Sequence, residues 1–269
     1  MAKQEKQSEE SVHIVNVERG RITFHLVGTA PLLHNCMSYK VHQELLLPAG
    51  RKTEADKKST LKHNPHEEYN ASIYRSKSGP TVVQHLASAF RGAMRSAALD
   101  LPGITKAEVG RMLWVEGDRV DIYGVPQLDM RIVRQAGMPR APDVRTRCIM
   151  PEWACTIVVS FTKPQFKEQA VANLLAAAGM YIGIGDYRNE KGAGNYGVFR
   201  ICDQDDEDFK RIVKTGGRKV QEAAMATPEP FNDETERLLS WFEGAVKEHR
   251  SFAPITKNGK RERATEVSS

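Results

Sequence analysis

The sequence has few cysteines, and they form no motif. Cys36, Cys148, Cys155 and Cys202 are scattered along the chain, with no CxxC pair. This spacing indicates neither a zinc knuckle nor a disulfide framework, which favours a reduced, cytoplasmic protein. No apolar run approaches the roughly 18 residues of a membrane span, and the first residues, MAKQEKQSEES, lack the apolar core of a secretory signal. We therefore expect no membrane partner.

Motifs of the common enzyme classes are also missing. The chain contains no HExxH, no GxSxG, no paired-carboxylate site and no GxxxxGK[ST] phosphate-binding loop. The acidic run DQDDEDF, residues 203–209, offers oxygen ligands for a divalent ion, but an acidic helix start explains it better. We therefore predict no metal site, no cofactor and no catalytic residue.

Basic charge is present in modest excess and is concentrated in segments. The chain carries 39 lysines and arginines against 34 acidic residues, a net charge of +5. Between Met130 and Met150 a single acid, Asp143, faces five arginines: Arg131, Arg134, Arg140, Arg145 and Arg147. One carboxylate cannot pair with five guanidinium groups, and the planar guanidinium suits phosphate and base stacking. This segment therefore predicts a nucleic-acid contact. Its methionines, which include Met138, are either wedges between bases or core filler.

Hydrophobic periodicity predicts an α+β fold. The expected elements are, in order, a strand that opens residues 21–35, an amphipathic helix at 81–101, a helix at 104–114 with Thr105 as N-cap, strands at 118–125 and 127–135 that form a hairpin, a buried strand at 154–164, a helix at 166–180 and a strand at 196–203. We interpret this series as the βαββαβ arrangement of a ferredoxin-like, RRM-type core, with the basic excursion inserted between its middle strands.

The remaining segments predict the domain organisation. Residues 1–11 are polar and expected to be disordered, and residues 12–210 form the core domain. This domain carries a long insertion at 36–80, which contacts either nucleic acid or a neighbouring subunit, and a basic excursion at 130–152. Residues 211–269 are expected to be linkers, with one amphipathic helix and a polar tail.

The run GIGDYRNEKGAGNYGVFRI, residues 183–201, joins the last predicted helix to the last predicted strand. Its glycines can present successive backbone N–H groups to an anion: Gly183, Gly185, Gly192, Gly194 and Gly197. Arg188 and Lys191 can add charge-assisted bonds to phosphate. The alternative is a structural turn that requires positive φ angles. The run is no dinucleotide-binding fingerprint, because it follows a helix and opens a strand.

Two further groups of side chains have alternative interpretations. Arg91 and Arg95 lie one turn apart on the 81–101 helix, so they either follow adjacent phosphates or occupy an exposed face. A histidine can take a proton from a 2′-hydroxyl group in metal-independent RNA cleavage. The candidates are His34, His63 and His66. His34 is better explained as a residue that caps a turn, and the other two lie in a polar region.

Four of these segments together resemble the RAMP superfamily of CRISPR effector complexes, particularly the repeated backbone subunit that coats guide RNA. They are TAPLLHN after the first strand, the helix PTVVQHLASAFRGAMRSAAL, the basic excursion where the family has its thumb, and the glycine-rich run. The resemblance covers about residues 20 to 203 as an order of elements, and only the helix and the glycine-rich run are specific.

The resemblance implies a non-catalytic protein of antiviral defense that binds a single-stranded nucleic acid, either guide RNA or DNA. It also implies that copies of the chain self-associate along the strand as a filament, and that other effector subunits are further partners. Backbone subunits that cut target RNA have an acid just after the Leu-His turn, whereas the run here, LLHNCMSYK, has none. The predicted nucleic-acid-binding residues are Arg91, Arg95, Arg131, Arg134, Arg140, Arg145, Arg147, Gly183, Gly185, Arg188, Lys191, Gly192 and Gly194.

Three alternatives remain open on the residues alone. One is a guide-processing endoribonuclease of the same superfamily, with His34 or a residue of the glycine-rich run as catalyst. Another is a single-stranded DNA-binding protein of a phage or plasmid. The third is a structural protein whose basic segments meet an acidic partner.

Overall fold

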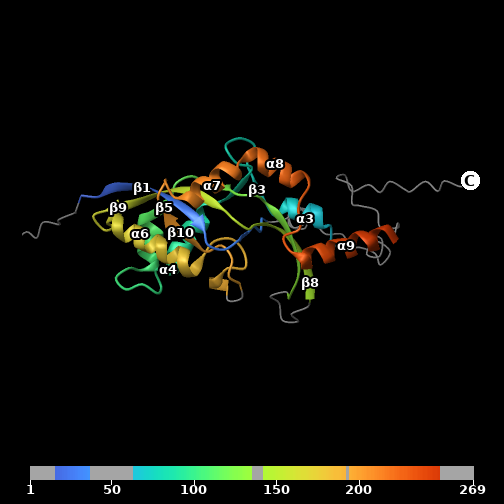
Figure 1. Ribbon diagram of the computed structural model, residues 1–269. Coiled ribbons are helices and arrows are strands. Elements are labelled where there is room, and N and C mark those ends of the chain that lie inside the picture. Colours follow the sequence, from blue (N-terminus) through green and yellow to red (C-terminus); the bar gives the residue numbers. More distant parts are fainter. Residues whose placement is uncertain (1–15, 37–62, 135–141, 192–193, 249–269) are drawn as a thin grey trace, which may run out of the picture.

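The computed structural model describes residues 16–36, 63–134, 142–191 and 194–248 (Figure 1). This part of the chain is a mixed α+β fold with two antiparallel sheets, which confirms the predicted class. Residues 1–11, most of the 36–80 insertion, the tip of the basic excursion and the polar tail lie outside the described residues. Within the described ranges, no helix has the length and apolarity that crossing a bilayer requires.

The larger sheet has seven strands. Six of them follow in the order β10-β1-β9-β6-β4-β3, and the seventh, β5, pairs with β9, as β6 also does. The strands are β1 (Glu18–Gly28), β3 (Tyr74–Arg75), β4 (Val83–Leu86), β5 (Leu113–Val115), β6 (Arg119–Tyr123), β9 (Ala154–Lys163) and β10 (Phe199–Cys202). Central strand β1 aligns Phe24 with Ile157 of β9 and Leu26 with Ile201 of β10. Its alternating apolar residues therefore place one face of the sheet in the core.

Helices cover both faces of this sheet (Figure 1). The helices of one face are α4 (Ala87–Ala97), α5 (Lys106–Met112) and α6 (Glu168–Ala177), which continues as a π-helical turn, η1 (Ala178–Ile182). Helix α3 (Pro65–Ala71) packs instead against β8 (Pro142–Met150). Phe90 and Met94 of α4 and Leu175 of α6 are buried with Phe24 and Leu26 in the main core. On the opposite face, α7 (Glu207–Thr215) packs Phe209 and Ile212 against Val27.

The smaller sheet is formed by β2 (Leu32–Leu33), β8 (Pro142–Met150) and β7 (Gln127–Arg134), in that order. Its strands β7 and β8 form the hairpin that corresponds to the predicted basic excursion. Three short connections join the two sheets, at residues 29–31, 124–126 and 151–153. Trp153, the largest fully buried side chain, donates a 2.9 Å hydrogen bond from Nε1 to the carbonyl oxygen of Ala30 and so links two of these connections.

Two sequence predictions about these elements are wrong. Residues 83–86 form strand β4 and not the first turn of the predicted 81–101 helix. The spacing of Val83, Leu86 and Phe90 matches a helix, but Val83 and His85 also alternate as buried residues of a strand. The strands at 118–125 and 127–135 form no hairpin, because β6 joins the large sheet and β7 the small one. The chain changes sheets at Gly124, whose φ is 142°.

The C-terminal part contains more helix than the sequence predicted. The run KTGGRK, residues 214–219, covers the end of α7, the turn at Gly216 and Gly217, and the start of α8 (Arg218–Ala226), a helix that the prediction missed. Helix α9 (Asp233–Glu248) confirms the predicted amphipathic helix. The acidic run at 203–209 starts α7 as expected, since the Asp206 side chain accepts a 3.0 Å hydrogen bond from the Phe209 N–H. Thr105 is likewise the N-cap of α5, with Glu108 completing a capping box.

Candidate nucleic-acid interface

The β7–β8 hairpin has one polar and one apolar face. Directly opposite residues of an antiparallel pair share a face, and the register joins Asp129 to Arg147 and Arg131 to Arg145. These four side chains therefore lie on one surface, which we call the hairpin face. The other face carries Leu128 and Met130, which are buried in the main core.

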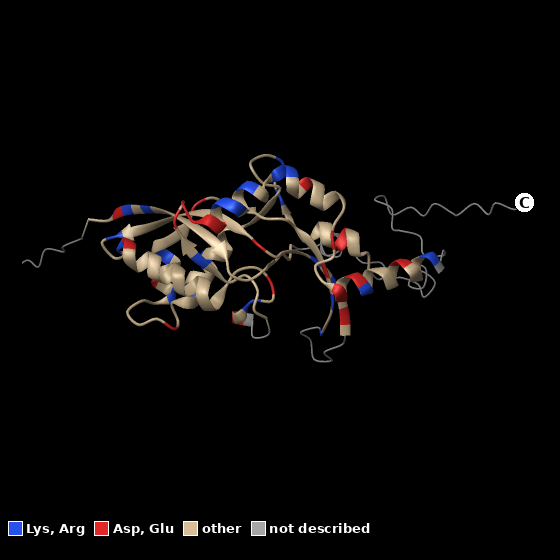
Figure 2. Cartoon of the chain, viewed as in Figure 1, with Lys and Arg blue, Asp and Glu red and all other residues tan. Residues whose placement is uncertain are grey.

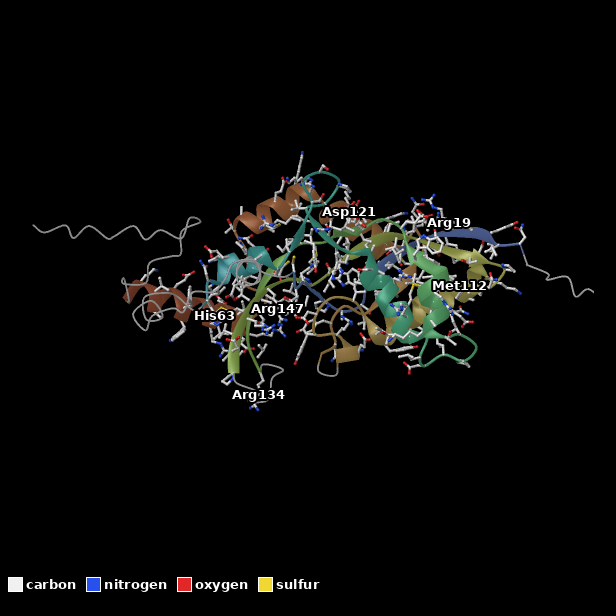
Figure 3. All side chains as sticks on the ribbon, turned by 180° about the vertical axis from the view of Figure 1, so that it is seen from behind. Arg19, His63, Met112, Asp121, Arg134 and Arg147 are labelled. Carbon is white, nitrogen blue, oxygen red and sulfur yellow. The ribbon has the colours of Figure 1, made fainter. Side chains whose placement is uncertain are left out.

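The five arginines of the predicted thumb do not form one cluster. Arg134 is three residues from Arg131 and so lies on the opposite face, at the distal end of the hairpin (Figure 3). Arg140 lies outside the described residues, as does Met138. Met130 and Met150 are buried, so they are core filler and not wedges. Arg145 is exposed and has no acidic partner among the described residues.

Arg131 is paired with an acid just outside the arginine-rich window. Its Nε lies 2.8 Å from Oδ2 of Asp129, whose side chain is almost fully buried. Nη1 donates a 3.0 Å hydrogen bond to the hydroxyl group of Tyr196, and the guanidinium carbon lies 5.2 Å from the centroid of that ring. Burial opposes the charge, but the bonds to Asp129 and Tyr196 outweigh it and raise the pKa of Arg131. This side chain therefore joins the hairpin to the glycine-rich run.

Arg147 is buried where the hairpin meets the same run (Figure 3). Its Nη1 lies 2.5 Å from Oδ2 of Asp186, while Nε and Nη2 have no hydrogen-bond partner in the described part of the chain. Burial lowers the pKa of Arg147, and the charges of Asp186 and Asp129 act against that shift. The prediction that the arginines lack acidic partners is therefore wrong for both Arg131 and Arg147.

The glycine-rich run is a tightly packed turn between the large sheet and the hairpin. Gly183 and Gly197 have φ angles of 74° and 72°, which other residues adopt at a cost. Their N–H groups bond to the carbonyl oxygens of Ala178 at 2.9 Å and Pro31 at 2.8 Å. The predicted nest of anion-facing N–H groups is therefore wrong at these two positions, and the structural-turn alternative holds there. Gly192 lies outside the described residues, as does the side chain of Lys191 in η2 (Asn189–Lys191).

Side chains of the run fasten it to its surroundings. Asp186 accepts a 2.9 Å hydrogen bond from Nδ2 of Asn35 in addition to the contact with Arg147. Arg188 donates from Nη1 to the carbonyl oxygen of Gly185 at 2.9 Å and pairs with Glu190 at 2.6 Å, so its charge is neutralised inside the run. A 2.6 Å hydrogen bond from Ser96 to Glu190 connects the run to α4.

Two aromatic rings lie beside the hairpin face. Tyr187 and Tyr196 lie on either side of η2 within the run, and their ring centroids are 5.9 Å apart with an interplanar angle of 40°. Tyr187 is 37% exposed. Gly194 lies so close to the Tyr187 carbonyl oxygen that a Cβ atom would collide with it. The run therefore brings the two tyrosines together next to Arg131, whose cross-strand neighbour on the hairpin face is Arg145.

Arg91 and Arg95 lie elsewhere, on the side of α4 that packs against α5. Arg91 donates from Nη2 to the carbonyl oxygen of Gly110, and the guanidinium of Arg95 lies 3.2 Å from the position that a Cβ atom on Gly110 would take. Both arginines therefore contact α5, and the structure does not bring them together with the hairpin face.

The three candidate histidines differ in their burial and contacts. His34 is fully buried, its ring centroid is 5.5 Å from that of His85, and both of its ring nitrogens lack a described partner. His63 contacts Glu68 at 2.8 Å and Asp143 at 3.1 Å. His66 is exposed on α3. Among the described residues, no three His, Cys, Asp or Glu side chains are placed to hold a metal ion.

Comparisons with solved structures identify a distant structural likeness. No protein-family model matches the chain, and no curated protein matches it. Among solved structures, Cmr6 from Pyrococcus furiosus matches with a TM-score of 0.35 and 13% sequence identity, over 69% of this chain and 98% of that chain. The likeness is distant. The residues of the interface are therefore assigned from their own contacts.

Sequence reasoning missed the residues that organise this interface. Asp129 lies one position before the arginine-rich window, Asp186 is in the glycine-rich run, and Tyr196 is near the end of that run. Asp129 and Tyr196 both bond to Arg131, and Asp186 bonds to Arg147. The bonds made by Tyr196 and Asp186 join the run to the hairpin, which a local sequence pattern does not show. Only the two tyrosines could be recognised from the sequence, as aromatic residues in a run that is rich in small and polar residues.

Positive charge is not confined to this interface. Lys and Arg are also spread over α7, α8 and the large sheet, with acidic residues among them (Figure 2).

Proposed function

We propose that this chain is a non-catalytic protein that binds single-stranded nucleic acid through the hairpin face and the adjacent tyrosines. The observation that carries the proposal is the convergence of Arg131, Arg145, Tyr187 and Tyr196 on one surface from segments about forty to sixty residues apart. Single-strand binding sites combine positive charge for the backbone with aromatic rings for the bases. This surface has both components.

Arg145 supplies the main electrostatic contact in this proposal. Asp129 and Asp186 neutralise Arg131 and Arg147, whereas Arg145 is exposed and has no described acidic partner. Arg131 still presents its guanidinium beside Tyr196, with its side chain 18% exposed. We therefore expect few phosphate contacts on each copy of the chain, and an affinity that depends on several copies or several bases.

The proposed scaffold is a ferredoxin-like core. The elements β1, α4, β5, β9, α6 and β10 follow in the order βαββαβ, and the corresponding strands pair as β10-β1-β9-β5. Hairpin β7–β8 and its connections are then an insertion between the second and third core strands. In this arrangement the core holds the hairpin and the glycine-rich run at fixed positions.

We propose that the bound strand is the guide RNA of a CRISPR effector complex. We also propose that several copies of the chain associate with one another along this RNA. What supports a binding function without catalysis is that His34 is buried and that LLHNCMSYK contains no carboxylate. Size measurements with short and long oligonucleotides test self-association. We expect particles that contain several copies of the chain only on the long strands.

The direct experiment measures binding and cleavage together. Labelled single-stranded RNA, single-stranded DNA and duplex DNA are incubated with the full chain in EDTA, across about 50 to 200 mM salt. We expect salt-sensitive binding of the single strands, weaker binding of the duplex, and intact oligonucleotides. Discrete cleavage products would favour the endoribonuclease alternative, and absence of binding at the lowest salt concentration would refute the proposal. Sequencing of nucleic acid that co-purifies distinguishes RNA from DNA.

A further inference from the structure

The two tyrosines of the glycine-rich run form an open pair and not a closed stack. Their planes are inclined by 40° and their centroids are 5.9 Å apart. The hydroxyl group of Tyr196 accepts a hydrogen bond from Arg131, whereas that of Tyr187 has no partner in the described ranges. Tyr187 is 37% exposed. Its ring is therefore available for a flat ligand.

The backbone at Tyr187 is unfavourable for a tyrosine. Its φ is 54°, and it is the only non-glycine residue with positive φ among the described residues. A side chain with a Cβ pays a steric cost in this conformation that glycine avoids. Fold stability alone would therefore favour glycine at this position. Besides its contact with the ring of Tyr196, the aromatic ring is therefore a candidate for a role in binding.

The turn that carries Tyr187 is fastened on several sides. Oδ1 of Asp186 accepts a 2.9 Å hydrogen bond from the Tyr187 N–H, and Oδ2 contacts Arg147 and Asn35. The Asp186 N–H donates to the carbonyl oxygen of Leu33 at 2.9 Å. These bonds attach Tyr187 to β8 and to the segment around β2. The ring is therefore presented from a rigid base, which lowers the entropy that a ligand must overcome.

Arg131 fixes the position of the second ring, that of Tyr196. Its guanidinium lies over Tyr196 at 5.2 Å and bonds to its hydroxyl at 3.0 Å, so the position of this ring is set from the hairpin. Guanidinium groups and aromatic rings both stack on flat π-systems, and Arg131 can do so although Asp129 pairs its charge. The base of an unpaired nucleotide is such a flat π-system.

We propose that Tyr187 and Tyr196 form a stacking site for one nucleobase of a single-stranded nucleic acid. This inference rests on the proposed function and adds the chemical group that is recognised. Stacking on an aromatic ring tolerates every base, because each base has a π-face. The site therefore selects unpaired nucleotides over duplex and does not select a sequence.

Two substitutions at one position separate stacking from folding. Tyr187→Phe keeps the ring, whereas Tyr187→Gly removes the ring and also relieves the positive φ. Binding is measured with the full chain and fluorescent oligomers of about 12 nucleotides, a length in the range of single-strand sites. One oligomer carries bases, and a matched oligomer has the same phosphates with abasic sugars.

We expect the wild-type chain and Tyr187→Phe to bind the base-bearing oligomer about tenfold more tightly than the abasic one, which is the size of one stacking contact. Tyr187→Gly should lose this preference while its urea unfolding midpoint stays equal or rises. Equal binding of both oligomers by the wild-type chain, or an unchanged preference in Tyr187→Gly, would overturn the stacking site and leave the proposed function standing. Failure of the wild-type chain to bind either oligomer at low salt would instead refute the proposed function.

Discussion

Arg147 of the hairpin and Asp186 of the glycine-rich run form a buried ion pair, with Nη1 2.5 Å from Oδ2, across 39 positions of sequence. The Arg147 side chain is 6% exposed and that of Asp186 is 32% exposed. This pair fixes how the small sheet meets the run that carries the two tyrosines. It is therefore a structural element of the interface and not a free cation of it.

Removal of Asp186 should destabilise the fold. Asp186→Ala leaves the buried guanidinium of Arg147 without its described hydrogen-bond partner, and isolated buried charges are costly. We expect a loss of about 3 kcal/mol in the free energy of unfolding, measured by urea titration. The double substitution of Asp186→Leu with Arg147→Met should recover part of this loss, because no buried charge remains. A change below about 0.5 kcal/mol in Asp186→Ala would contradict the assignment.

Arg145 should determine the salt dependence of nucleic-acid binding. Each phosphate contact contributes about 0.7 to the slope of log K against log salt for single strands. Arg145→Ala should therefore weaken binding and reduce the slope by about this amount. It should leave the unfolding free energy nearly unchanged, because the side chain is exposed. The matched control is Arg111→Ala, an exposed arginine on α5. Equal slopes for the two variants would count against the hairpin face.

The arginines of residues 130–152 show what sequence can and cannot predict. The excess of arginine at 130–152 correctly marked a distinct segment, because composition changes there. It could not show that Arg147 is buried against Asp186, since that depends on the meeting of two sheets. Nor could it show that Arg134 faces away from Arg131, because the boundaries of the hairpin set the alternation.

The fold was more predictable than the interface. Strands β1 and β9 and helices α6 and α9 have strong periodic patterns over eight or more residues, and they form where expected. Strand β4 was missed because four residues, Val83–Leu86, fit both a helix and a strand. Pairing of β6 and β7 was predicted from a short connection, but β6 pairs with β4 and β9 instead. Partner choice between sheets is a tertiary property that local pattern does not contain.

Gln221 should be among the most sensitive polar positions of the fold. Its Oε1 accepts hydrogen bonds from the N–H groups of Val82 at 2.7 Å and Val83 at 3.0 Å. Its Nε2 lies 2.8 to 3.1 Å from the carbonyl oxygens of Ile122, Gly124 and Gly216. The side chain is fully buried where β4, β6 and the α7–α8 turn meet. It therefore satisfies backbone groups that no other described side chain reaches.

Gln221→Leu should lower the unfolding free energy by about 3 kcal/mol, because several buried backbone groups lose their partner at once. Gln169→Leu is the matched control, since Gln169 is exposed on α6 and bonds only to Asn173 among the described residues. We expect that control to change stability by less than about 0.5 kcal/mol. Similar urea midpoints for the two variants would show that Gln221 has no such role.

Stability should fall in mild acid because of two buried histidines. Burial lowers the pKa of His34 well below its ordinary value of 6.5, with His85 adding to the effect. Burial also lowers the pKa of His85 to about 4, with Arg188 contributing and a backbone hydrogen bond to Leu86 opposing. The unfolded chain therefore binds protons at a higher pH than the folded chain does. The stability contributed by the neutral rings is complete above pH 6.5 and is lost as the pH falls toward about 4.

For His85 alone, the interval between 6.5 and about 4 corresponds to roughly 3 kcal/mol, at about 1.4 kcal/mol per pH unit. Urea unfolding at several pH values between these limits measures the slope. His85→Phe should make it shallower, because a phenyl ring cannot take up a proton in either state, while His34 still contributes. His66→Phe is the control, since His66 is exposed on α3 and should keep the wild-type slope. The effect is separate from that of Asp206, whose pKa the Arg200 side chain lowers to about 2, so that its contribution is lost only in stronger acid. A slope unchanged by His85→Phe would show that the buried ring is not the source of acid sensitivity.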